Sequence, residues 1–144
     1  MSDLALQGNM PEILALESWI KANTNQEEQL ATAETNHYQI KGVYVRELKL
    51  KAGTILTGKI HNFESIGILS QGRMRILTSS GAFIVEAPYI TVDQPGIKRL
   101  GVCETDCTFV TVHRTDAEEI SDIEDELVSD TFEEFEVKRL GRDL

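Results

Sequence analysis

Short apolar runs separated by turn residues fill the sequence from Tyr38 to His113. The runs are rich in β-branched residues, and turn signals such as the segment from Asp93 to Gly96 interrupt them every eight to twelve residues. Seven or more short strands in this pattern are typical of antiparallel sheets that form a sandwich or a barrel. The sequence therefore predicts an all-β domain, which we place at residues 35–114.

The centre of this region is the stretch 53–72, which begins and ends with glycine and contains two predicted strands. The first runs from Ile55 to His61 and the second from Ile66 to Ser70, and a polar turn between them predicts a hairpin. Side chains alternate between the two faces of a strand, so Lys59 and His61 are expected to point the same way. This pair is the most prominent chemical feature of the predicted domain.

Acidic residues dominate the charge of the chain. Its 144 residues include 24 Asp and Glu against 14 Lys and Arg, which gives a formal net charge of −10. This balance disfavours nucleic acid and anionic membranes as partners, because both need clustered basic residues. No apolar run approaches the ~20 residues of a membrane span, and the N-terminus lacks a signal-peptide pattern. We therefore expect a cytosolic protein with no membrane partner. Cys103 and Cys107 could pair across a hairpin turn, but a reducing cytosol favours free thiols.

Residues 1–34 are predicted to be an N-terminal helix and a linker. Asn9 is a plausible N-cap, and apolar residues then recur at helical spacing, which predicts an amphipathic helix over residues 10–21. Such a helix must bury its apolar stripe against the body of the protein or against a neighbouring subunit.

Residues 115–144 are predicted to be an acidic C-terminal helix and tail. Thr115 and Glu118 have the spacing of a capping box, which predicts a helix over residues 116–127. Eleven Asp or Glu and no Lys or Arg lie between residues 116 and 136. The segment is either a solvated helix packed on the barrel or a tail that docks on a partner. For residues 130–144 we expect order mainly through contact with another chain.

The central residues resemble the motifs of the cupins, which are small jelly-roll barrels. The first cupin motif is Gly, five residues, His-x-His, three or four residues, Glu, six residues, Gly. Gly53, His61 and Gly72 fit this motif. Lys59 stands at the position of the first histidine, and Ser65 stands at that of the glutamate.

The second cupin motif, Pro-x-Gly-x-x-His, is matched only by Gly96, and Arg99 stands at the histidine position. More narrowly, small cupin-like proteins that tailed bacteriophages encode resemble this chain over roughly residues 35–125, in the runs VYVRELKLKAGTILTGKIH, EAPYITVDQPGIKRLG and TVHRTD. The resemblance implies a single cupin jelly-roll barrel, a viral origin, and a location in the host cytoplasm or in the virion.

Lys59, His61 and Arg99 are the candidate ligand-binding residues. Of the cupin ligand positions only His61 carries an imidazole, and the two cations would repel a divalent ion, so we expect no metal and no other cofactor. The three side chains either are structural, satisfied by water or by carboxylates such as Glu47 or Glu86, or form a pocket for a small carboxylate, phosphate or sugar acid.

The sequence shows no Ser-His-Asp spacing and no glycine-rich phosphate loop, which favours a role without catalysis. The resemblance implies a metal-free, non-enzymatic binding or virion-associated accessory protein. We expect a homo-oligomer, formed through edge strands and the N-terminal stripe, and a phage structural protein as a further partner. The alternative is a cupin that binds or isomerises a sugar or organic anion with Lys59, His61 and Arg99.

Overall fold

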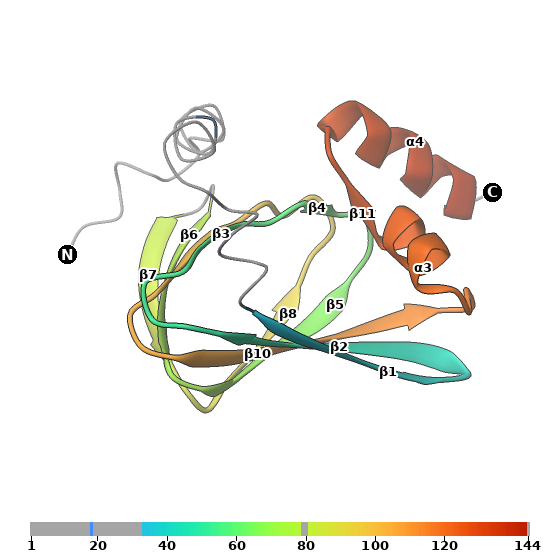
Figure 1. Ribbon diagram of the computed structural model, residues 1–144. Coiled ribbons are helices and arrows are strands. Elements are labelled where there is room, and N and C mark those ends of the chain that lie inside the picture. Colours follow the sequence, from blue (N-terminus) through green and yellow to red (C-terminus); the bar gives the residue numbers. More distant parts are fainter. Residues whose placement is uncertain (1–17, 19–32, 79–80, 144) are drawn as a thin grey trace.

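The computed structural model describes residue 18, residues 33–78 and residues 81–143 (Figure 1). The strands are β1 (Glu34–Ile40), β2 (Gly42–Leu50), β3 (Ile55–Thr57), β4 (Ile60–His61), β5 (Ser65–Gln71), β6 (Arg73–Thr78), β7 (Gly81–Glu86), β8 (Tyr89–Asp93), β9 (Leu100–Cys103), β10 (Cys107–Thr115) and β11 (Val128–Ser129). The helices α3 (Ile120–Leu127) and α4 (Phe132–Asp143) come near the C-terminus. The prediction of an all-β jelly roll is thereby confirmed, whereas the helix predicted over residues 10–21 lies outside the described residues. In the described part of the chain, no helix has the length and apolar character needed to cross a membrane.

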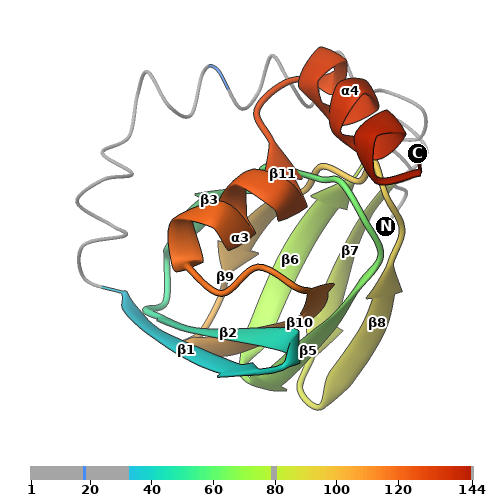
Figure 2. The same ribbon diagram turned by 90° about the vertical axis from the view of Figure 1, so that its right-hand side faces the viewer.

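Two antiparallel sheets face each other and enclose the core (Figure 2). The larger sheet has the strand order β1-β2-β10-β5-β8, and the smaller sheet has the order β3-β9-β6-β7. Alternation along each strand sends every second side chain inward. The inward residues of both sheets form one apolar cluster, which includes Leu50, Leu69, Met74, Ile76 and Val85. Each such side chain stabilises the fold by roughly 1.5–3 kcal/mol through burial.

The hairpin predicted for the centre of the chain is wrong. β3 pairs with β9 in the smaller sheet, β4 pairs with β11, and β5 pairs with β10 and β8 in the larger sheet. The predicted first strand breaks at Gly58, whose backbone amide donates to the Arg99 carbonyl at 2.9 Å. A Cβ at this position would lie 3.2 Å from the same oxygen, so glycine allows the close approach. Because the strand is interrupted, the alternation rule no longer links Lys59 to His61.

The capping box predicted at the start of the C-terminal helix is also wrong. α3 begins at Ile120, and its N-cap residue, Glu119, makes no side-chain capping bond. The Thr115 hydroxyl instead accepts from the Ala117 amide at 3.1 Å and donates to the Glu126 carboxylate at 2.8 Å. The hydroxyl is therefore used in a turn before the helix.

α3 closes one end of the barrel (Figure 2). Its buried residues, Ile123 and Leu127, pack against Tyr44 of β2. Asn62, which the sequence placed in a simple turn, is fully buried and holds this end in place. Its side-chain amide donates to the Glu126 carbonyl at 2.8 Å and accepts from the Ser129 hydroxyl at 2.6 Å.

The acidic tail is helical and lies against its own chain. α4 contacts β4 and β11, and the Phe135 ring lies against Gly96. The Lys138 ammonium donates to the carbonyls of Asp125 at 2.7 Å and Val128 at 2.9 Å, which joins α4 to the end of α3. The described part of residues 130–144 therefore has contacts within its own chain, and the expectation that another chain orders this segment stays a prediction.

Candidate functional site

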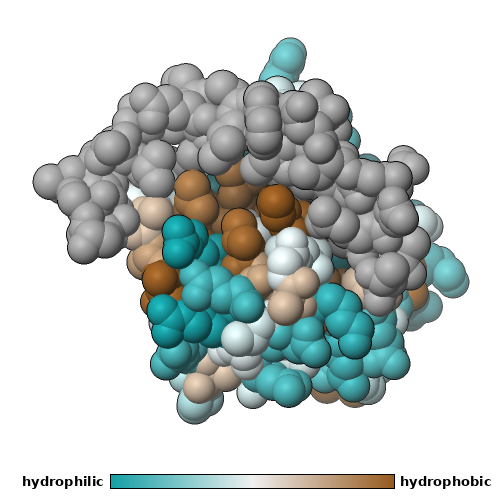
Figure 3. All heavy atoms as spheres, turned by 60° about the vertical axis from the view of Figure 1, so that its left-hand side comes forward, coloured by the Kyte–Doolittle hydropathy of each residue, from teal (hydrophilic) through white to brown (hydrophobic). Residues whose placement is uncertain are grey.

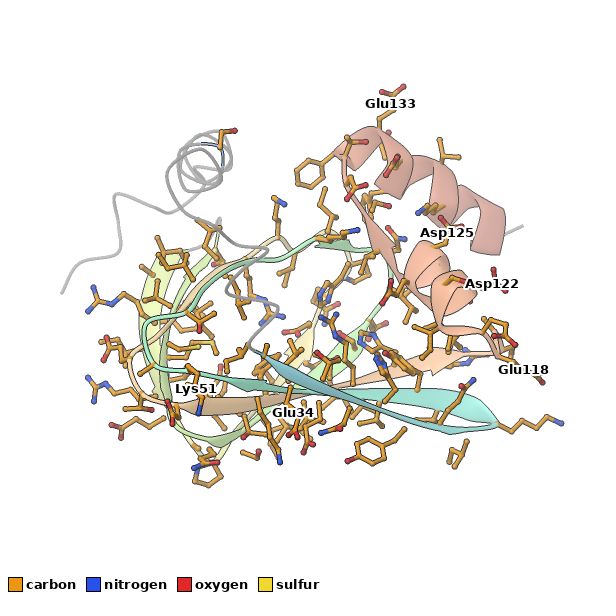
Figure 4. The ribbon with its side chains drawn as sticks, viewed as in Figure 1. Glu34, Lys51, Glu118, Asp122, Asp125 and Glu133 are labelled. Atoms are coloured by element: carbon orange, nitrogen blue, oxygen red, sulfur yellow. The ribbon has the colours of Figure 1, made fainter. Side chains whose placement is uncertain are left out.

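A cavity of about 390 Å³ lies inside the barrel, between the two sheets and beneath α3. Figure 4 shows side-chain nitrogen atoms gathered in this interior space. Most of the wall is apolar, with residues from strands of both sheets, the loop before β9 and α3: Leu48, Ile55, Leu56, Met74, Ile76, Ile97, Leu100, Phe109, Ile123, Leu127 and Val128. The polar residues of the wall are Tyr44, Arg46, Lys59, His61, Arg99, Thr111, His113 and Glu124. An apolar cavity with a few convergent polar groups is the usual form of a small-molecule site.

Two neighbouring strands, β2 and β10, supply half of these polar side chains. Tyr44 lies opposite His113 in the register, and Arg46 lies opposite Thr111, so alternation points all four into the barrel. The rings of Tyr44 and His113 stack with centroids 6.0 Å apart. The Tyr44 hydroxyl forms a hydrogen bond with Nδ1 of His37 on β1, at 2.6 Å.

His61 and His113 form a pair of imidazoles in the cavity, with ring centroids 6.1 Å apart. Nδ1 of His61 is 3.3 Å from the Ser65 hydroxyl, and Nε2 of His113 is 2.9 Å from the Thr111 hydroxyl. Burial, and then the charge of Arg99, lowers the pKa of His61 to about 4. Burial, and then the charge of His61, lowers the pKa of His113 to about 4. Both rings are therefore neutral near pH 7, and each has one donor and one acceptor.

The free energy of unfolding should fall as the pH drops from 6.5 toward about 4. In this window the unfolded imidazoles bind protons that the folded ones do not bind, so acid favours the unfolded chain. The slope is at most about 1.4 kcal/mol per pH unit for each histidine. Urea unfolding near pH 7 and near pH 5 measures it, and a His61→Gln/His113→Gln variant should show a flatter dependence. A variant with the full wild-type slope would contradict the lowered pKa values.

Arg99 is held by a carboxylate that the sequence analysis missed. Its Nη2 lies 2.5 Å from Oδ2 of Asp93, and the two side chains are 18% and 3% exposed. The carboxylates expected in this role are elsewhere: Glu47 accepts from Asn36, and Glu86 pairs with Arg73 on the outside of the barrel. Asp93 begins a strong turn signal, which concealed its inward position as the last residue of β8.

Arg46 borders the cavity without such a partner. No carboxylate of the described residues lies within ion-pair distance of its guanidinium. Its positive charge contributes to lowering the pKa of both His61 and His113. Arg46 and His113 belong to no cupin motif position, but the alternation along β2 and β10 is a signal that could have identified them.

The three residues predicted from the sequence all border the cavity, but they do not form one cluster. His61 and Arg99 lie in the interior. Lys59 lies at the rim, where its side chain is 60% exposed and its ammonium is 3.4 Å from Asp130. Lys59 lies in the break between β3 and β4 and belongs to neither strand, so the alternation along β4 that applies to His61 does not apply to it.

A cupin-type metal site does not fit the described residues. None of their His, Cys, Asp and Glu side chains form a group of three that could hold an ion. The two imidazoles share the cavity with Arg46, whose charge has no carboxylate partner among the described residues and would repel a divalent cation.

We therefore keep the prediction that the purified protein contains no stoichiometric transition metal. Elemental analysis of protein prepared without chelators should give far less than one Fe, Mn, Ni or Zn per chain. About one metal per chain would contradict this prediction and would require ligands from outside the described residues.

No protein-family model matches the chain, and no curated protein matches it either. Solved structures do match. A cupin superfamily protein from Desulfitobacterium hafniense aligns with a TM-score of 0.53 at 8% identity, over 59% of this chain and 79% of that chain. An RmlC-like cupin family protein with a double-stranded β-helix fold, from Methanocaldococcus jannaschii, gives 0.52 at 15% identity, over 59% and 82%. KdgF from a Halomonas species gives 0.51 at 11% identity, over 60% and 81%.

These identities are too low to carry an activity from one protein to another, and none of the three structures bears on the predicted phage origin. Cys103 and Cys107 are both buried, and no disulfide joins them in the structure. The strand order, the barrel cavity and the structural matches together establish the fold. This chain is a jelly roll of the cupin type.

Proposed function

We propose that the barrel binds a small organic anion in its cavity, with Arg46 as the charged anchor. The observation that carries this proposal is the guanidinium of Arg46, which borders the cavity and has no carboxylate partner among the described residues. Arg46 is partly buried, and a cation that is partly withdrawn from water is stabilised when an anion accompanies it. Arginine binds carboxylates and phosphates through two parallel hydrogen bonds, so a carboxylate ligand would supply the missing charge.

The other polar residues fit the role of orienting such a ligand. Neutral His61 and His113 can each donate or accept one hydrogen bond without adding charge. Arg99 is already paired with Asp93, so its contribution to the net charge of the site is small. Since most of the wall is apolar, the ligand that fits best has an apolar body and one anionic group.

Binding accounts for these residues better than isomerisation does. A general base works best when its pKa is near the working pH. His61 and His113 have pKa values of about 4, which makes them weak bases near neutrality. The cavity is therefore suited to hold a ligand more than to remove a proton from one.

The experiment is a titration monitored by two-dimensional NMR with matched pairs of ligands. Benzoate and hexanoate are the anionic probes, and benzamide and hexanamide are their neutral counterparts. We expect the carboxylates to shift the signals of β2 and β10 and to bind at least ~10-fold more tightly than the amides, as a charge-assisted hydrogen bond predicts. Equal affinities for acids and amides would overturn the proposal.

A virion-associated accessory role is a second proposal, which rests only on the resemblance of residues 35–125 to tailed-phage proteins. Mass spectrometry of purified virions tests it directly. It is compatible with ligand binding, because the cavity and the outside of the barrel are different surfaces.

A further inference from the structure

The outward side of the five-stranded sheet is apolar across all of its strands. Alternation and register place ten apolar residues there, in rows that cross the strands. We call this surface the outer face; its residues are Tyr38, Ile40, Val43, Val45, Ile66, Ile68, Ile90, Val92, Val110 and Val112. The central row runs through Tyr38, Val45, Val112, Ile66 and Val92, which are successive cross-strand partners.

The outer face is exposed to solvent in the part of the chain that the structure describes. Five of its large side chains (Tyr38, Ile40, Ile66, Ile90 and Val92) are between 41% and 71% exposed. α3 and α4 lie on the other side of the sheet, so neither of these helices covers it (Figure 1). The smaller sheet is different, because its outside carries Arg73 and Arg75 paired with Glu86 and Glu104. Figure 3 shows a side of the molecule on which hydrophilic and hydrophobic residues are mixed.

The area of the outer face suits a protein interface. Five strands at ~4.8 Å spacing and five residues at ~3.3 Å each give a plan area of roughly 400 Å². The largest apolar patch on a typical monomer covers ~300–600 Å² and is often functional. The apolar patch is about half of the ~800 Å² that each partner buries in an interface of standard size, so the polar residues around it must supply the rest.

The charges at the two ends of the outer face are complementary. Arg114 lies in the row of Val43, and Glu47 lies in the row of Val110, so the central row separates them. Consider a twofold axis that lies in the interface along the central row, perpendicular to the strands. It places the row of Val43 of one copy over the row of Val110 of its partner. Arg114 of one copy would then lie beside Glu47 of its partner, and this pair would occur twice.

We propose that two copies of this chain associate through the outer face, with the twofold axis along its central row. The sheets would stack face to face, as in a β-sandwich, and bury the apolar rows of both copies. A partner of opposite charge is not needed, because the middle of the face is uncharged although the chain carries a net charge of −10. This surface differs from the edge strands and N-terminal stripe expected from the sequence, and it does not depend on ligand binding in the cavity.

Sedimentation of the full chain over roughly 1–100 µM tests the proposal. The wild-type protein should be a dimer, and Ile90→Glu should dissociate at least ~100-fold more readily, because each dimer would bury two carboxylates in an apolar interface. The matched control is Ile84→Glu, which makes the same change at an exposed position of β7 in the smaller sheet, and it should remain dimeric. Circular dichroism checks that each variant is folded.

A charge exchange tests the twofold arrangement and does not require a change in the apolar rows. Arg114→Glu and Glu47→Arg should each weaken the dimer roughly tenfold, and the two together should restore it, because both pairs are reversed at once. A wild-type monomer at the highest concentration overturns the proposal, whether the face is bare or is covered by residues 1–32. The proposal is also overturned if Ile90→Glu dimerises as tightly as the wild type. The same holds if the double variant dimerises no more tightly than the two single variants.

Discussion

An Arg46→Met variant is expected to lose about 10- to 100-fold in affinity for carboxylate ligands while retaining its fold. A hydrogen bond to a charged group contributes ~1.5–3 kcal/mol, and Arg46 is the guanidinium that borders the cavity without a carboxylate partner among the described residues. Methionine keeps a long unbranched side chain in the cavity wall and removes only the charged end. Isothermal titration with benzoate or hexanoate, whichever binds the wild type more tightly, measures the loss.

The control for this variant is Arg75→Met. Arg75 lies on the outside of the smaller sheet, where its guanidinium is 3.1 Å from Glu104. The substitution removes the same charge from the chain, so it should leave carboxylate affinity within about twofold of the wild type, since exposed charges act weakly at a distance. If the Arg46→Met variant binds the carboxylate as tightly as the wild type does, Arg46 is not the anchor.

A Gly72→Ala variant is expected to lose roughly 3–5 kcal/mol of stability, which is a large share of the 5–15 kcal/mol of a typical domain. Gly72 lies between β5 and β6 with φ of 96°, a conformation that costs L-residues about 1–2 kcal/mol. A Cβ there would lie 2.2 Å from the backbone oxygen of Asp106, and also inside contact distance of Cys107. Backbone must therefore move in two segments to make room.

Gly53→Ala separates these two costs. Gly53 also has positive φ, at 85°, but a Cβ there would have no other atom within 4 Å. This variant should lose only the conformational term of about 1–2 kcal/mol. Urea unfolding of the wild type and both variants measures the difference, and equal losses would show that the approach of Asp106 to Gly72 adds nothing.

The sequence alone determined the type of fold and the position of most strands. Alternation of apolar residues and the spacing of turn residues depend on neighbours along the chain, so β2, β5, β6 and β10 could be placed without knowledge of their partners. The need for glycine at residue 53 also belongs to this local level, because its positive φ is a property of the backbone and no distant atom approaches the position.

Only the tertiary structure decided which strands pair and which side chains meet. The break at Gly58 depends on the Arg99 carbonyl, which is far away in the sequence. The local pattern therefore predicted one strand where the structure has β3 and β4. The same applies to the site: Arg46 and His113 come together through the register of β2 with β10, and Asp93 reaches Arg99 across a turn. Register and sheet order are set by long-range contacts that bury the apolar faces, and a single sequence does not specify which pairing buries them best.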